Sequence, residues 1–206
     1  MLRTLPVLML SAWITLSFST RATADWAIDN NDSRLSFVSI KANTVGEVHH
    51  FQELEGGLSA EGSFVLTIVL ASVETGIPIR NERMRELFFD TGRFPTATLT
   101  SSLDLDPLLD LAVGEQTTMV AEAQLELVGS STALTIESMV ARLDANTLLV
   151  SSAQPVVLNA DALGLTQGVE HLREIAGLPS ISPAVPVSFR LTLREDAAAE
   201  STASQR

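Results

Sequence analysis

The feature that most constrains the fold of this chain is a regular alternation of apolar and polar residues. In the last such run, every second residue from Val185 to Leu193 is apolar, and Ser188, Arg190 and Thr192 lie between them. A period of two places apolar side chains on one face of a β-strand and polar side chains on the other. The pattern therefore predicts strands that bury one face and expose the other to water.

Eight runs of this kind follow one another and are separated by turn residues such as Gly129-Ser130-Ser131. They cover residues 35–42, 45–58, 64–72, 96–105, 117–128, 132–143, 147–158 and 184–193. The second run contains Gly56-Gly57, where a bend is expected. Many sequential strands in one unit favour a closed antiparallel barrel over a sandwich, because closure removes exposed sheet edges. The predicted fold is thus all-β, an eight-stranded antiparallel barrel with apolar side chains inside.

Two segments break the alternation and predict short helices. Residues 81–89 place Met84, Leu87 and Phe88 on one helical face, with charged residues on the other. A second helix is expected from about residue 167 to residue 176, where Gly177 and Pro179 end it. The predicted architecture is therefore a barrel with two short helices.

The first 24 residues have the pattern of a secretory signal peptide. Arg3 precedes an apolar run over residues 5–18, and Ala22-Thr23-Ala24 provides small residues for cleavage after Ala24. Residues 196–206 are rich in Ala, Glu and Ser, and we expect them to be disordered. The sequence thus predicts an exported chain with one barrel domain over residues 25–195.

Composition excludes several classes of function. Residues 1–24 hold Arg3 and Arg21 and no acid, so eleven basic residues remain against 25 acidic ones, a formal charge of −14. Such a chain offers a phosphate backbone no broad basic face, so nucleic acid is not expected as a partner. No apolar stretch of about 18 residues remains to form a transmembrane helix. Because the chain has no cysteine, thiol catalysis, disulfides and cysteine-ligated metals are excluded.

The alternation leaves two descriptions of the interior open. An eight-stranded barrel is just wide enough to be filled by side chains or to hold one small or elongated ligand. Inward positions of residues 117–128 include the small residues Ala121 and Ala123, which leave room for a ligand. Bulky residues on the opposite strands would fill the same space in a packed barrel.

Several phrases of the sequence follow one another in a characteristic order. They are Trp26-Ala27-Ile28-Asp29, Asn31-Asp32-Ser33-Arg34-Leu35-Ser36-Phe37, Leu70-Ala71-Ser72-Val73-Glu74-Thr75-Gly76, Ile79-Arg80-Asn81-Glu82-Arg83-Met84 and Phe94-Pro95-Thr96-Ala97. In this order, over about residues 26–193, the chain resembles the YceI-like family of bacterial exported, lipocalin-like proteins. Asn81 differs from the family pattern, because the family often has aspartate at this position.

The resemblance implies a lipocalin-like antiparallel barrel with an elongated hydrophobic cavity. It also implies a long apolar ligand, such as an isoprenoid, an isoprenoid quinone or a fatty-acid-like amide. We expect no cofactor. The main hypothesis is therefore a periplasmic carrier that sequesters one such chain, in a family linked to stress responses. A homodimer is a further expectation, since some relatives are thought to form dimers.

We expect the ligand to contact inward apolar side chains from most of the strands. These candidates are Phe37, Phe64, Leu66, Ile68, Met119, Leu125, Leu134, Ile136, Val187, Phe189 and Leu191. The alternation constrains the choice of inward face least for the run that contains Phe64. The other candidate is Arg80, which we expect to hold a polar or anionic head group by charge-assisted hydrogen bonds.

Arg80 stands out because it directly precedes the first predicted helix, whose first N–H groups also favour an anion. It belongs to a cluster in which four of the eleven basic residues fall within fourteen positions: Arg80, Arg83, Arg85 and Arg93. The alternative for this cluster is a solvated helix face that pairs with Glu82, Glu86 and Asp90.

No arrangement of a nucleophile and a base stands out, and the common hydrolase, phosphate-loop and metalloprotease motifs do not occur. His49 and His50 are adjacent, so on a strand they point to opposite faces and do not readily share a metal. His171 and Glu174 have a spacing that can hold a metal, but this spacing is common on amphipathic helices. We therefore expect no catalytic residue and no metal site.

Two other functions remain open on the sequence alone. The first is a hydrolase or isomerase that acts on a lipid-like substrate in the same cavity. The polar groups that the sequence offers it are His49 or His50, Glu53 and scattered serines and threonines. The second is an interaction module with a packed interior, whose acidic face docks a membrane redox partner.

Overall fold

The computed structural model describes residues 26–195, so the predicted signal peptide (1–24) and the predicted C-terminal tail (196–206) lie outside the described residues. The strands are β1 (Trp26–Ile28), β2 (Arg34–Lys41), β3 (Val45–Phe51), β4 (Leu54–Leu58), β5 (Ser63–Val69), β6 (Val73–Glu74), β7 (Thr96–Ser102), β8 (Gln116–Leu127), β9 (Ser130–Asp144), β10 (Thr147–Ser152), β11 (Val156–Asn159) and β12 (Ala184–Glu195). The helices are α1 (Pro78–Arg83), α2 (Asp106–Leu109) and α3 (Thr166–Ile175), with short 3-10 turns at Asn30–Asp32 and Leu70–Ser72. A π-helical segment, η3 (Met84–Phe88), follows α1 directly.

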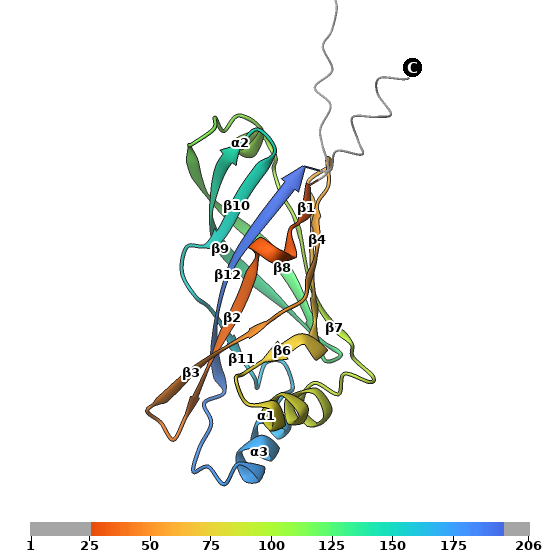
Figure 1. The fold of residues 1–206 in the computed structure, drawn as a ribbon, viewed down its shortest axis with the longest axis vertical. Coiled ribbons are helices and arrows are strands. Elements are labelled where there is room, and N and C mark those ends of the chain that lie inside the picture. The colour runs from red at the N-terminus through yellow and green to blue at the C-terminus, as the bar shows by residue number, and fades with distance from the viewer. Residues whose placement is uncertain (1–25, 196–206) are drawn as a thin grey trace, which may run out of the picture.

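The strands form one antiparallel sheet that closes on itself (Figure 1). The strands β4, β5, β7, β8, β9, β10 and β12 are neighbours in that order, and β1 closes the ring by pairing with both β4 and β12. Along the chain, β2 continues β1, β3 leads into β4, and β10 leads into β11. Eleven segments therefore make eight barrel strands, and the two-residue β6 pairs with β3. The predicted eight-stranded antiparallel barrel is confirmed.

Two glycines in β4 allow the ring to close between β1 and β5. A Cβ atom at Gly57 would lie 2.0 Å from the backbone oxygen of Trp26, and one at Gly56 would lie 2.1 Å from that of Val65. Side chains do not fit at such distances, and Gly56 also has a φ of +117°, which favours glycine. The pairing of β4 with β5 runs unbroken through both glycines, where three strands approach one another closely.

Several predicted boundaries were wrong. The run 45–58 breaks at Gln52-Glu53, where the hydroxyl of Ser72 accepts hydrogen bonds from both backbone N–H groups at 3.1 and 3.0 Å. The run 147–158 breaks next to Pro155, which has no N–H group for a strand ladder. The first helix begins at Pro78 rather than residue 81, because proline suits the first turn of a helix. The second helix agrees with the prediction to within one residue.

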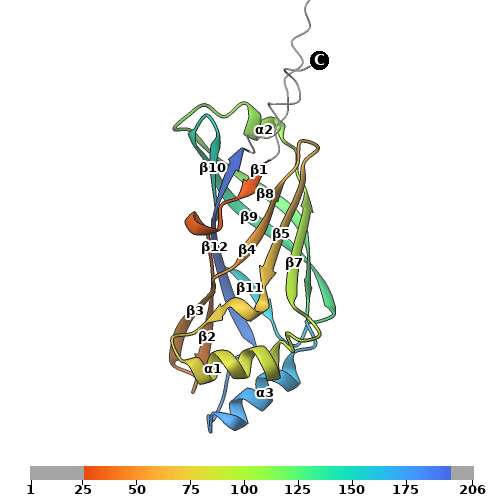
Figure 2. The ribbon, with the colours of Figure 1, turned by 45° about the vertical axis from the view of Figure 1, so that its right-hand side comes forward.

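Helices mark the two ends of the barrel (Figures 1 and 2). The helices α1 and α3 lie side by side across one end, and α2 lies at the other. At Gly168 of α3, a Cβ atom would lie 2.9 Å from Cδ2 of Phe88, so α3 packs closely on η3. Trp26 pairs with Glu195 at the α2 end, where both ends of the described chain meet. The sequence-based prediction did not include α2, a helix of only four residues.

Candidate ligand-binding cavity

The barrel encloses an elongated, mainly apolar cavity of about 630 Å³. Inward side chains from all eight barrel strands line it, together with residues of α1, α2 and α3. All twelve predicted ligand-binding residues lie in its wall: Phe37, Phe64, Leu66, Ile68, Arg80, Met119, Leu125, Leu134, Ile136, Val187, Phe189 and Leu191. The structure therefore brings these side chains together around one space, and their contact with a ligand remains a prediction.

The alternation of β8 explains why the cavity is hollow at mid-length. Met119, Ala121 and Ala123 face the cavity, whereas Val120 points outward and is 65% exposed. The bulky residues on opposite strands do not fill the space beside the two alanines. Of the two interiors that the sequence left open, the barrel has the hollow one.

The cavity is long as well as apolar. Its lining extends along β12 from Val185 to Leu193. This part of the strand spans about 26 Å, and a strand tilt of about 40° makes that about 20 Å along the barrel axis. A space of this shape suits a single chain better than a compact ligand.

The charged part of the cavity wall lies at the α1–α3 end. The strands β2 and β3 are joined by a turn at this end. Toward that turn, the inward residues are Leu35, Phe37, Ser39 and Lys41 on β2, and Phe51, His49 and Glu47 on β3. Both strands thus change from apolar to polar inward residues over the same stretch. This change gives the cavity one polar end and one apolar end.

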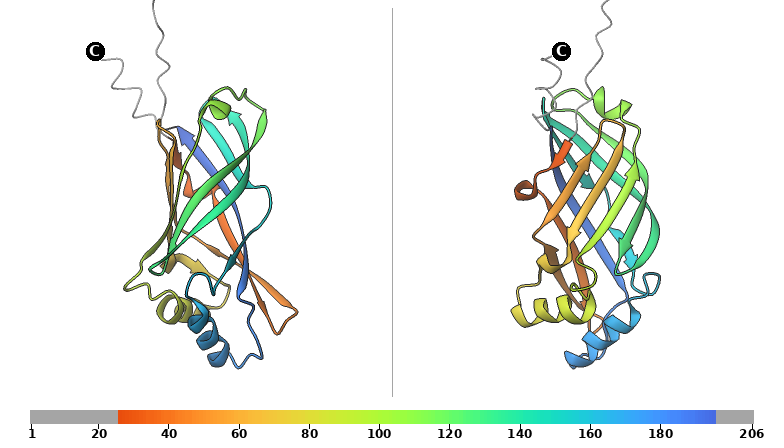
Figure 3. Two further views of the ribbon diagram at one scale, coloured as in Figure 1. Left: turned by 180° about the vertical axis from the view of Figure 1, so that it is seen from behind. Right: turned by 90° about the vertical axis from the view of Figure 1, so that its right-hand side faces the viewer.

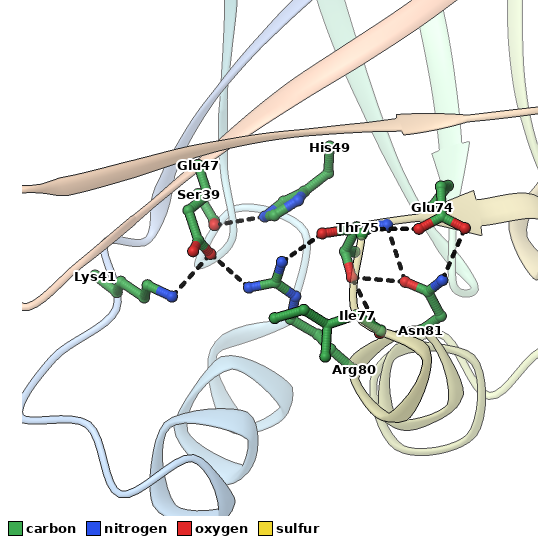
Figure 4. Close-up of polar contacts among 10 residues, drawn as sticks. Ser39, Lys41, Glu47, His49, Glu74, Thr75, Ile77, Arg80 and Asn81 are labelled. Carbon is green, nitrogen blue, oxygen red and sulfur yellow. Dashed lines mark hydrogen bonds and ion pairs between the residues drawn. The ribbon is translucent and has the colours of Figure 1, made fainter.

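Arg80 faces these polar residues from α1 (Figure 4). Its Nη1 donates to Oε2 of Glu47 at 2.5 Å, and its Nη2 donates to the backbone oxygen of Thr75 at 2.6 Å. Lys41 Nζ lies 2.8 Å from the same Glu47 oxygen. Hydrogen bonds from Lys41 and Arg80 hold the pKa of Glu47 below its usual value, although burial opposes them. Two cations therefore share one carboxylate, which leaves a net positive charge beside the cavity.

The structure corrects the reason for which Arg80 was predicted. The residue lies inside α1 rather than before it, so the N–H groups of the first helical turn do not add to an anion site. Its guanidinium instead joins α1 to β3 across the polar end of the cavity. The Nε–H group of Arg80 is buried, and no atom of residues 26–195 accepts a hydrogen bond from it.

The arginine cluster divides into two parts. Arg80 and Arg83 line the cavity, whereas Arg85 donates to the backbone oxygen of Ala71 at 3.3 Å. The guanidinium of Arg93 lies 4.9 Å from the ring centre of Phe94. In the part of the chain that the structure describes, none of the four arginines forms an ion pair with the three acidic residues that the alternative named. Neither hypothesis therefore describes the whole cluster.

Asn81 fixes the loop that accepts the hydrogen bond from Arg80 (Figure 4). Its Oδ1 accepts from the backbone N–H of Thr75 at 2.9 Å and from the Thr75 hydroxyl at 2.6 Å. Its Nδ2 donates to Oε2 of Glu74 at 3.1 Å. An ionised aspartate has no hydrogen to donate to Glu74, so the amide is what matches this site. Asn81 thus stabilises the loop at the polar end of the cavity.

His49 is the buried histidine of the adjacent pair, at 2% exposure, and its ring centre lies 5.2 Å from that of Phe37. Its Nε2 shares a hydrogen bond of 2.8 Å with the hydroxyl of Ser39. Burial, helped by the positive charge of Arg80, lowers the pKa of His49 to about 4. The imidazole is therefore neutral near pH 7. His50 is partly exposed on the other face of β3, as the alternation predicts.

Sequence reasoning missed Ser39, Lys41 and Glu47. A signal for the first two was present, since they continue the inward spacing of two residues from Phe37. Glu47 shares the inward face of β3 with His49, but the sequence did not decide which of the two histidines points inward. All three residues were therefore absent from the candidate list.

The late helix does not bring a metal site together. Arg173 bonds to Glu170 at 2.7 Å and lies 3.4 Å from Glu174, the two carboxylates that flank His171. Over residues 26–195, no group of three or more histidine, cysteine, aspartate or glutamate side chains is placed to hold a metal ion. Within the same residues, no helix has the length and apolar character needed to cross a membrane.

Comparison with known proteins gives a family match and several similar structures. Residues 26–193 match the model of the YceI-like domain. A polyisoprenoid binding domain from Saccharophagus degradans, implicated in plant cell wall breakdown, has a TM-score of 0.82 and 38% identity over 84% of this chain and 99% of that one. No curated protein matches the chain.

Two more distant structures share the fold. Burkholderia cenocepacia BcnA has a TM-score of 0.62 and 21% identity over 80% of this chain and 98% of its own. The YCEI protein of Campylobacter jejuni has a TM-score of 0.54 and 14% identity over 72% of this chain and 84% of its own. At these identities the likeness concerns the barrel alone.

Proposed function

The chain belongs to the YceI-like family, and from this premise we propose that it is a periplasmic carrier that sequesters one long apolar chain inside the barrel. The observation that supports this most directly is the hollow, elongated cavity of about 630 Å³ with its apolar wall. The 38% identical structure described as a polyisoprenoid binding domain favours an isoprenoid chain over other apolar ligands. The periplasmic location rests on the signal-peptide pattern of residues 1–24.

Burial of the chain would supply the free energy of binding. Each methylene group removed from water contributes about 0.8 kcal/mol before the cost of ordering the ligand. The polar end of the chain would lie beside Arg80 and Lys41, where the wall carries a net positive charge. The ligand would therefore bind in one orientation, with its polar end beside Arg80 and its apolar tail toward α2.

The family and the 38% identical structure point to a binding protein rather than an enzyme. The cavity does contain a contact between Ser39 and His49, which is the pairing that a serine hydrolase requires. However, burial lowers the pKa of His49 to about 4, which makes it a weak base. Over residues 26–195, its Nδ1 also has no carboxylate to orient it. The interaction-module hypothesis required an interior filled by side chains, whereas the barrel contains a cavity.

Native mass spectrometry tests the carrier proposal. Protein purified gently from a periplasmic fraction is expected to have the mass of a chain that begins at Asp25, and to carry one apolar chain. Stripped protein should gain one molecule of a linear polyprenol per barrel, and a mass of two chains would reveal the expected homodimer. If the protein always appears at its bare mass and binds neither polyprenol nor a fatty amide, the proposal is wrong.

Replacing Arg80 by glutamine tests the placement of the polar end. Arg80→Gln is expected to weaken binding of a polyprenyl phosphate about tenfold or more, because a hydrogen bond to a charged group contributes about 1.5–3 kcal/mol. Binding of the uncharged polyprenol of the same length should change much less. The measurement is titration of both ligands by intrinsic fluorescence or calorimetry.

Arg93→Gln is the matched control, because Arg93 stacks on Phe94 and does not belong to the cavity wall. This variant removes the same charge and should leave both affinities unchanged. Equal losses for the phosphate and the alcohol in Arg80→Gln would show that Arg80 supports the fold rather than the head group.

A further inference from the structure

The α2 end of the cavity is closed by side chains that belong to one apolar cluster. Leu108 of α2 is 4% exposed and packs there with Leu58, Leu148 and Leu193, each of which also lines the cavity. Figures 1 and 3 show α2 at the end of the barrel that lies opposite α1 and α3. Leu108 thus reaches the cavity from the loop between β7 and β8, whereas the other three residues belong to the barrel strands.

The segment that carries Leu108 is tied firmly to the barrel by Arg142 of β9. The Nη2 of Arg142 donates to the backbone oxygen of Leu108 at 2.9 Å, and its guanidinium lies 5.6 Å from the ring centre of Trp26. The backbone of Arg142 also accepts from Gly114 at 2.8 Å and donates to Glu115 at 3.0 Å. These contacts hold the loop at α2 and at the end that leads into β8, so α2 is a fixed part of the cavity wall.

The two ends of the cavity therefore differ in polarity and in exposure to solvent. At the α1–α3 end, the wall includes the charged, partly exposed Lys41 and Glu47 and the exposed Ile79. At the α2 end, the wall includes the four buried leucines together with the buried Val140. A chain with a polar end that enters such a space places its apolar tail against α2, and the tail stops where the leucines meet.

We propose that Leu108 sets the maximum length of the apolar chain that the barrel accepts. The proposal rests on the proposed carrier function and adds a determinant of specificity to it. The alanine variant replaces an isobutyl group by a methyl group at the end of the cavity, and it leaves the space of the missing atoms open to a longer tail. A larger side chain at the same position shortens the cavity.

Competition within a ladder of linear polyprenols of increasing length tests the proposal. The protein is mixed with an equimolar ladder, and native mass spectrometry reports which length is bound most. In Leu108→Ala, the preferred length is expected to move up by about one isoprene unit, and in Leu108→Phe it is expected to move down. Opposite shifts from one position do not follow from a general loss of stability.

Leu54→Ala is the matched control. Leu54 is as deeply buried as Leu108 but packs in the core and does not belong to the cavity wall. The preferred length should stay that of the unmodified protein, although the thermal midpoint falls. If Leu108→Ala does not fold, Leu108→Val provides the smaller change in the same direction.

The outcomes separate this inference from the proposed function. If the unmodified protein binds no polyprenol of any length, the carrier function itself is wrong. If it binds polyprenols and both Leu108 variants prefer the same length as the unmodified protein, only the role of Leu108 is wrong. A shift in Leu54→Ala equal to that in Leu108→Ala would also overturn the proposal.

Discussion

Replacing Ala123 by phenylalanine is expected to lower the affinity for a long polyprenol by more than 100-fold. Ala123 is 6% exposed and faces the cavity from β8, opposite Leu134 on β9 and Ser101 on β7. A benzyl group at this position fills the middle of the cavity and separates the α1–α3 end from the α2 end. Loss of contact for about four methylene groups costs about 3 kcal/mol, which is more than a factor of 100 in Kd.

Val120→Phe provides the control on the same strand. Val120 points outward, so the added ring lies in solvent and leaves the cavity unchanged. The measurement is native mass spectrometry and fluorescence titration with one polyprenol, with circular dichroism to show that both variants are folded. If folded Ala123→Phe still binds one polyprenol as tightly as Val120→Phe does, the ligand does not occupy the barrel.

The Ala123 prediction depends on a part of the structure that the sequence specified well. The inward and outward residues of long strands differ so strongly in polarity that the spacing of two residues alone assigns their faces. This holds for β8, β9 and β12, whose predicted cavity residues all lie in the wall. Resemblance to a known family added the hollow interior, which alternation left undecided.

The polar end was harder to predict, because its contacts join residues far apart in the chain. Arg80 meets Glu47 from a different element, 33 residues away, and no local pattern encodes that pairing. The strand that carries Glu47 also has apolar residues on both faces, since Val48 points outward and is 67% exposed. The sequence also did not predict that α2 closes the other end of the cavity, because a helix of four residues is too short for its periodicity to be recognised.

The stability of the protein is expected to fall as the pH is lowered from 8 to 5, and His49 is the main cause. In the unfolded chain a histidine takes up a proton near pH 6.5, whereas burial and the charge of Arg80 lower the pKa of His49 in the folded protein to about 4. Between these two values the unfolded state binds a proton that the folded state does not bind. The free energy of unfolding therefore decreases with falling pH, by about 2 kcal/mol between pH 8 and pH 5.

The charged groups around His49 act in both directions. Arg80, Lys41 and His50 disfavour a second positive charge, and Glu47 partly offsets them. Carboxylates with lowered pKa values, such as Glu47, also lose stabilising charge in acid, but only below their usual value of about 4.5. The interval from pH 8 to pH 5 therefore reports mainly on the histidines.

Urea unfolding at a series of pH values measures this effect, and His49→Gln identifies its source. Glutamine keeps a partner for the hydroxyl of Ser39 and does not titrate, so most of the decrease between pH 8 and pH 5 should disappear. His50→Gln is the control, because the pKa of His50 is also lowered but its side chain is partly exposed. A pH dependence that is unchanged in His49→Gln, or that is lost only in His50→Gln, would show that the buried imidazole does not carry the effect.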